Sequence, residues 1–133
     1  MAGPLVYVDT SEVHENAAES IRGTIDELVV FIETHEPRLL GYGVYLSDDG
    51  RRMTVVHVHM DSATLEEHLD VGGPAFKPFA DLIELRAIDV YGEPSDRAIE
   101  QLRAKAEMLG SGEGHHPSAR RRVHSLPVRL TVC

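Results

Sequence analysis

Several residue types that build common functional sites are scarce in this sequence of 133 residues. It has one cysteine, Cys133, and no tryptophan, and aromatic residues make up 5% of it. A single cysteine excludes an intramolecular disulfide and any cysteine-rich zinc or iron–sulfur site. No apolar run approaches the roughly 18 residues that a membrane span needs, so we expect no membrane partner.

Basic residues are also in deficit. The chain has 13 Lys and Arg against 22 Asp and Glu, which gives a formal net charge of −9 at pH 7. Because nucleic-acid binding depends on clustered cations that neutralise phosphates, we expect no nucleic-acid partner. Residues 1–7 show no basic region followed by a long apolar segment, and we therefore expect a cytoplasmic protein. The 42% hydrophobic content is sufficient for one folded domain.

Hydrophobic patterning predicts alternating strands and helices. Runs of β-branched and aromatic residues predict strands at 5–9, 39–46, 53–60 and 86–91. Apolar residues at helical spacing predict a helix over 21–36, one that begins at Asp61 or Ser62, a short one over 75–85, and one from 94–96 to Gly110. Between residues 47 and 51 we predict a hairpin turn. Beyond Gly110 we predict a flexible linker over 111–118 and a strand over 126–132.

The order strand, helix, strand, strand, helix, strand is that of the ferredoxin-like α+β fold. It predicts an antiparallel four-stranded sheet with the helices on one face. The other face must then meet solvent, a ligand or a partner. We expect residues 1–94 to form this domain, and residues 95–133 to add a C-terminal helix, a linker and a strand-like arm to it.

Strand alternation divides the sheet residues into two faces. We predict that the more apolar set packs under the helices: Val6, Val8, Val56, Val58, Met60, Ile88 and Val90. We predict that the amphipathic set forms the open face: Leu5, Tyr7, Asp9, Met53, Val55, His57, His59, Ala87, Asp89 and Tyr91. An ordinary solvent-exposed face would carry more Lys, Glu and Thr, so the open face is where we expect a site.

The hairpin register decides which residues of the second strand join the histidines. A three-residue loop at 48–50 would place Gly41, Gly43 and Tyr45 on the histidine face. A two-residue loop at 49–50 would place Tyr42, Val44 and Leu46 there instead. We prefer the three-residue loop because it leaves glycines opposite Val55 and His57, which would open a cavity.

Three segments of the chain resemble the antibiotic biosynthesis monooxygenase superfamily. They are Ala63-Thr64-Leu65-Glu66-Glu67-His68-Leu69, Phe76-Lys77-Pro78-Phe79 and Val90-Tyr91-Gly92-Glu93-Pro94. The resemblance covers residues 5–94 and implies a dimeric α+β barrel, in which two ferredoxin-like subunits pack their open sheet faces together. It therefore implies a homodimer.

The same resemblance implies an activity. Some members of the superfamily oxidise quinols, anthrones or related polycyclic aromatics without metal or flavin, which implies a monooxygenase with no cofactor. His68 matches a histidine that is common at this helical position in the family. The absence of tryptophan disfavours the haem-degrading branch, and residues 95–133, which extend beyond the usual domain, are expected to wrap across the dimer.

The predicted open face supplies a candidate site for a small aromatic substrate. We assign catalytic roles to His57, His59, His68, Asp9 and Tyr45, and substrate contacts to Tyr7, Val55, Phe76, Asp89 and Tyr91. Oxidation by O2 requires a base that removes a phenolic or benzylic proton, and the ordinary pKa of histidine, ~6.5, suits that role. A neighbouring carboxylate could orient an imidazole, and a tyrosine hydroxyl could bind a developing oxyanion.

Two other interpretations of these residues remain open. The histidines and tyrosines could form a polar dimer seam in a structural or small-molecule-binding protein. Alternatively, His57 and His59, two residues apart on one strand, could bind a metal ion with Asp9 as a third ligand. Our prediction is an oxygenase with no resident metal.

Overall fold

The computed structural model describes residues 3–36 and 38–110. Along them the elements are β1 (Leu5–Val13), η1 (Glu15–Ala17), α1 (Ile21–His35), β2 (Gly41–Leu46), β3 (Arg52–His59), α2 (Ser62–Gly72), η2 (Gly73–Asp81), β4 (Ile83–Tyr91) and α3 (Asp96–Leu109). The two η elements are 3-10 helices. The linker and strand predicted beyond residue 110 lie outside the described residues.

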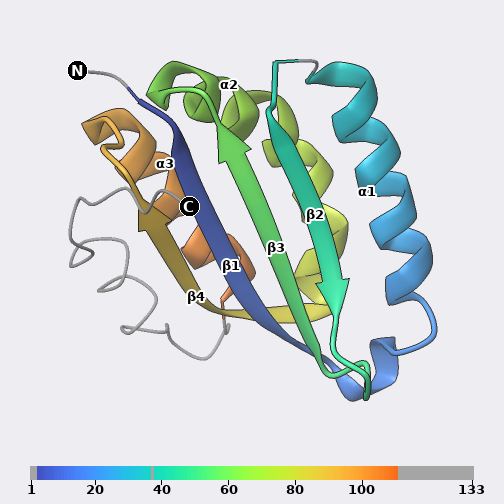
Figure 1. Ribbon diagram of the computed structural model, residues 1–133. Coiled ribbons are helices and arrows are strands. Elements are labelled where there is room, and N and C mark those ends of the chain that lie inside the picture. Colours follow the sequence, from blue (N-terminus) through green and yellow to red (C-terminus); the bar gives the residue numbers. More distant parts are fainter. Residues whose placement is uncertain (1–2, 37, 111–133) are drawn as a thin grey trace.

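The strands form one sheet in the order β2-β3-β1-β4, and every neighbouring pair is antiparallel. Figure 1 shows α1, α2 and α3 on the same side of this sheet. Buried side chains of all three helices join those of the strands in one hydrophobic core. The predicted α+β ferredoxin-like fold is confirmed. Within the described ranges, no helix has the length and apolarity that a membrane span requires.

Two strands are longer than predicted. β1 continues through the polar residues after Asp9 as far as Val13 because it pairs with β3 on one side and β4 on the other. β4 begins at Ile83, where a helix was predicted, and Ile83 pairs with Val13. Backbone pairing on both sides of a central strand outweighs the weak local preference of polar residues for turns.

The helix boundaries agree well with the prediction. Asp61 caps α2, since its carboxylate accepts a hydrogen bond from the backbone N–H of Thr64 at 2.9 Å. Ser95 caps α3 in the same way through Ala98. The predicted helix over 75–85 is the shorter 3-10 segment η2, which buries Phe76 and Phe79 against the core.

Two of the four strands, β1 and β3, have the reverse sidedness of the prediction. Tyr7, Asp9, His57 and His59 are all buried, and each contacts His68 of α2 or Lys105 of α3 on the side covered by the helices. The four valines predicted to be inside, Val6, Val8, Val56 and Val58, are half-buried on the face that no described helix covers. For β4 the prediction was right, because Ile88 and Val90 do point inward.

The hairpin register is also the one that we did not prefer. Ser47 pairs with Arg52, and Leu46 with Met53. The turn closes through a hydrogen bond from the Gly50 N–H to the Ser47 carbonyl, with Gly50 at φ 72°, a conformation that glycine adopts readily. This register places Tyr42, Val44 and Leu46 on the histidine face.

Candidate functional site

A cluster of polar side chains lies between the sheet and the helices, in what would ordinarily be an apolar core. Its members are Tyr7 and Asp9 on β1, Glu36 just after α1, Tyr42 on β2, His57 and His59 on β3, His68 on α2 and Lys105 on α3. We call these eight residues the buried polar cluster. Buried polar groups are retained where hydrogen bonds or ion pairs satisfy them, so the contacts within the cluster indicate what it can do.

Lys105 is the cation at the centre of the cluster. Its ammonium donates to Asp9 Oδ2 at 2.8 Å and to the Tyr7 hydroxyl at 3.0 Å. The same nitrogen lies 4.2 Å from the ring centroid of Phe76, a distance that allows a cation–π contact. α3 therefore positions a positive charge against the inner face of the sheet.

His68 is held in one orientation by a carboxylate. Its Nδ1 donates to Glu36 Oε1 at 2.6 Å, an acceptor that fixes the tautomer with the lone pair on Nε2. Nε2 lies 3.4 Å from the Tyr7 hydroxyl, which itself accepts from Lys105. A continuous chain of contacts thus runs from Lys105 through Tyr7 and His68 to Glu36.

The two strand histidines differ in their partners. His57 Nε2 donates to Asp9 Oδ2 at 3.3 Å, and its ring stacks on Tyr7 with centroids 3.7 Å apart. His59 has no hydrogen-bond partner on either ring nitrogen among the described residues, although its side chain is 0% exposed. His68 stands between them, with ring centroids 5.0 Å from His57 and 5.1 Å from His59.

Burial controls the charge of these groups. It lowers the pKa of His57, His59 and His68 to about 3 each, so the three imidazoles are neutral near pH 7. Each is a weaker base than the ordinary pKa of ~6.5, assumed from sequence, implied. It also raises the pKa of Tyr7 well above its usual range, so the hydroxyl keeps its proton.

The two carboxyl groups respond in opposite directions. Burial raises the pKa of Glu36 to about 7. Burial acts in the same direction on Asp9, but the Lys105 charge and the His57 hydrogen bond outweigh it and lower the pKa of Asp9 to about 2. Asp9 is therefore ionised and paired with Lys105.

The three histidines could also hold a metal ion. One ring nitrogen from each of His57, His59 and His68 lies within 4.8 Å of the other two. Neutral imidazole nitrogens are ligands that zinc, copper, nickel and iron accept.

A surface groove reaches the cluster beside α3. It encloses about 250 Å³ and is lined by Leu69, Asp70, Gly73, Phe76, Gln101, Ala104, Lys105 and Met108. An inner cavity of about 20 Å³, close to the space of one water molecule, is lined by Asp9, Tyr42 and Val55 together with apolar residues. Phe76 and Lys105 line both spaces, so they form the wall between the groove and the interior.

Seven of the ten predicted site residues lie on the helix-covered side of the sheet. Six of them are described above: Tyr7, Asp9, His57, His59, His68 and Phe76. Val55 is the seventh, and it is 3% exposed beside the inner cavity.

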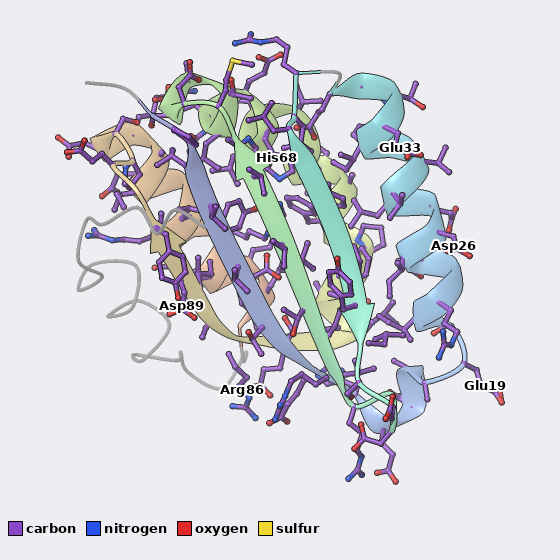
Figure 2. All side chains as sticks on the ribbon, viewed as in Figure 1. Glu19, Asp26, Glu33, His68, Arg86 and Asp89 are labelled. Atoms are coloured by element: carbon purple, nitrogen blue, oxygen red, sulfur yellow. The ribbon has the colours of Figure 1, made fainter. Side chains whose placement is uncertain are left out.

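The other three predicted site residues lie on the opposite face. Tyr45 pairs with Thr54 and is 61% exposed, so the prediction that it shares the histidine face is wrong. Asp89 pairs with Val8, and Tyr91 pairs with Val6. Figure 2 shows Asp89 on β4, well separated from His68. The expected cavity under the glycines is absent from the described structure, since the Tyr45 side chain covers Gly43 on the outer face.

Three members of the buried polar cluster were missed by sequence analysis. Lys105 could have been found, because it lies three residues after Leu102 and four before Leu109 on the buried stripe of α3. A lysine on such a stripe is an informative exception to apolar spacing. Glu36, at the end of a helix, gives no comparable signal, and Tyr42 depended on the hairpin register.

Comparisons with known proteins give matches by structure. No family model matches the sequence, and no curated protein matches it in sequence. The structure of MupZ from Pseudomonas fluorescens is similar over 100% of this chain and 89% of its own, with a TM-score of 0.67 and 17% identity. SnoaB from Streptomyces nogalater, a cofactor-independent oxygenase, is similar over 71% of this chain and 96% of its own, with a TM-score of 0.58 and 14% identity.

A third structure bears on the resemblance predicted from sequence. A protein of Caulobacter crescentus, which carries the provisional name antibiotic biosynthesis monooxygenase, is similar over 67% of this chain and 86% of its own. The TM-score is 0.57 and the identity is 18%. At these identities the likeness concerns the fold. This chain has the ferredoxin-like α+β fold of the antibiotic biosynthesis monooxygenases, as its sequence motifs predicted.

Proposed function

We propose that this protein is a cofactor-independent monooxygenase that oxidises a small aromatic or quinol-like molecule with O2. The observation that carries the proposal is the contact chain from Lys105 through Tyr7 to His68. It leads from the wall of an open groove to a neutral, oriented imidazole. The fold shared with a cofactor-independent oxygenase supports the same reaction class.

The substrate is expected to lie in the groove between α2, η2 and α3. Its volume, about 250 Å³, is below the roughly 300–1,000 Å³ of sites for drug-sized ligands, so it suits a molecule of one or two fused rings. Phe76 offers an aromatic face, and the Lys105 ammonium offers a charge for a phenolate or enolate oxygen.

The first step is removal of a phenolic or benzylic proton. The substrate proton passes to Lys105, which lines the groove, as Lys105 gives one of its protons to the Tyr7 oxygen and Tyr7 gives its own proton to His68 Nε2. Glu36 holds the imidazole by its Nδ1–H. Lys105 stabilises the substrate anion, which transfers electrons to O2. For a substrate CH2 group the balance is one O2 consumed, one carbonyl formed, and the second oxygen atom released as water.

The direct test is oxygen consumption by EDTA-treated protein over a panel of naphthols and hydroquinones, with anthrones included as larger, three-ring substrates. We expect O2 uptake with at least one member, with one oxygen atom incorporated into the product and one released as water per O2 consumed. Tyr45→Phe is the matched control, because Tyr45 lies on the opposite face, and this variant should retain full activity. A folded protein that consumes no O2 with any member of the panel would contradict the proposal.

The groove can be tested separately from the chemistry. Ala104 is an exposed residue of α3 that lines the groove, and Ala104→Trp would fill it without disturbing the core. We expect at least a tenfold rise in KM, about 1.4 kcal/mol of lost binding, with little change in stability. Unchanged KM values for Ala104→Trp would place the substrate elsewhere.

We further propose that the open sheet face binds a second copy of this chain. Val6, Val8, Val56 and Val58 form an apolar surface there that no described helix covers. Such surfaces on antiparallel sheets are commonly buried by a partner. Self-association of this face gives the homodimer that the sequence resemblance implied.

Sedimentation velocity tests the dimer. We expect Val56→Lys to convert a dimer into a monomer, because it places a charge in an apolar interface. Val30→Lys, on a 61% exposed residue of α1, makes the same chemical change away from that face and should remain dimeric. A monomeric wild-type protein would show that the chain does not dimerise. A dimeric Val56→Lys variant would show that it dimerises through another surface.

A further inference from the structure

His59 is a fully buried imidazole with two unsatisfied nitrogens. Its side chain is 0% exposed, and neither nitrogen has a partner among the described residues. Burying a polar group without a partner destabilises a folded protein. The position therefore suits a ligand that accepts a nitrogen lone pair.

The two neighbouring imidazoles are close enough to share such a ligand. Nitrogens of His57, His59 and His68 lie within 4.8 Å of one another. Three atoms with this maximum spacing all lie within about 2.8 Å of a common point, which is 4.8 Å divided by √3. Zinc–imidazole bonds are ~2.0–2.1 Å, so each ring would need to move by less than about 1 Å.

The surroundings of these rings match those of metal-binding histidines. A ligating histidine usually donates its other ring N–H to a carboxylate, which orients it and raises its basicity. His68 donates to Glu36 at 2.6 Å, and His57 donates to Asp9 at 3.3 Å. These bonds leave a lone pair on His68 Nε2 and on His57 Nδ1, and the latter has no partner among the described residues.

We infer that His57, His59 and His68 together bind one divalent transition-metal ion of the class that prefers imidazole, such as zinc. Asp9 orients His57 in this site and is not a ligand, because Lys105 holds its carboxylate at 2.8 Å. The ligand set thus differs from the sequence alternative, in which Asp9 was the third ligand.

Metal binding goes beyond the proposed function and does not require it. One consequence does rest on it: an ion on His68 Nε2 takes the lone pair toward which the Tyr7 hydroxyl points. The loaded protein cannot then accept the substrate proton. The ion is thus an inhibitor of the proposed oxidation, and chelation restores it.

The test is calorimetric titration of EDTA-treated, dialysed full-length protein with zinc chloride. It is carried out in a His115→Ala, His116→Ala background, because that adjacent pair could bind zinc by itself. We expect one zinc ion per chain. His59→Leu should weaken binding at least about 100-fold, and Glu36→Gln about 10–100-fold, as is typical for a carboxylate behind a ligand.

Cobalt gives a second readout that is independent of activity. Cobalt bound by three imidazoles should show visible d–d absorption that His59→Leu abolishes. His35→Ala, which removes an exposed histidine of α1, should bind both ions like its parent. Thermal melts in EDTA show whether His59→Leu is folded, and we expect it to melt no lower than its parent because an unsatisfied group has been removed.

Two results would overturn the metal site. One is the lack of saturable zinc binding by the folded background protein, and the other is a folded His59→Leu protein that binds zinc as tightly as its parent. Zinc binding by a protein that oxidises nothing in EDTA would support the site and contradict only the proposed function. Oxidation in EDTA by a protein that does not bind zinc would support the proposed function and contradict the metal site.

Discussion

Lys105→Met is expected to lower the free energy of unfolding by about 3–5 kcal/mol, the range for breaking one side of a buried ion pair. The side chains of Lys105 and Asp9 are 6% and 4% exposed. Without the ammonium, the Asp9 carboxylate stays in the core with only a hydrogen bond from His57. Methionine fills a similar volume, so the loss of stability reports the missing charge and not a cavity. Urea denaturation in EDTA, followed by circular dichroism, gives the value.

Companion variants show whether loss of the Lys105–Asp9 ion pair causes the destabilisation. Asp9→Asn alone should also destabilise, since it leaves a buried ammonium without its counterion. The double variant should be more stable than the sum of the two losses predicts, with a coupling energy of about 2–3 kcal/mol. Arg38→Met breaks an ion pair whose partners are 54% and 43% exposed, and it should cost less than about 1 kcal/mol. Equal losses for Lys105→Met and Arg38→Met would contradict the buried pair.

Tyr7→Phe is expected to lower kcat of the proposed oxidation by about 10²–10⁴-fold, the usual contribution of a general acid or base. The change removes only the hydroxyl that joins Lys105 to His68. The ring can still stack on His57, so the fold should persist. KM should stay close to the wild-type value, because the substrate lies in the groove, which Tyr7 does not line.

Tyr42→Phe is the matched control for that variant. Tyr42 is another tyrosine of the buried polar cluster, and its hydroxyl has no hydrogen-bond partner among the described residues. Losing this hydroxyl removes no link of the contact chain, so kcat should remain near wild type. Steady-state O2 uptake with EDTA present measures both variants. Similar kcat values for the two would show that the Tyr7 hydroxyl carries no proton in the reaction.

The sequence predicted the elements and the fold better than it predicted the site. The cap at Asp61 and the helical spacing of α1 and α3 depend on residues that are close together in the sequence, so local patterns can predict them. The order of elements then restricts the topology to a few choices. The histidines of β3 and α2 were singled out because their residue types are unusual at such positions, and the structure places all three in the buried polar cluster.

The side of the sheet that is buried could not be read from alternation. A period of two gives two faces and leaves open which one the helices cover. Hydrophobicity favoured Val6 and Val58 as the inner set. The actual inner set is stable because Lys105, distant in sequence from β1, pairs with Asp9 and donates to the Tyr7 hydroxyl. Tyr45 is separated from the histidines because a one-residue difference in the hairpin register changes which residues of β2 share a face with His57 and His59.

The contact between Tyr7 and Lys105 joins residues 98 positions apart in the chain. During synthesis, β1 leaves the ribosome long before α3 does, so Tyr7 and Asp9 lack their cation until residue 105 has been translated and α3 has folded. Such distant contacts form slowly, because a long loop must close before any interaction offsets its entropy. A chain interrupted before residue 105 carries all three cluster histidines and an unpaired Asp9 carboxylate. Such a chain is therefore expected to have an unstable core, and unstable chains are the ones that cellular proteases remove.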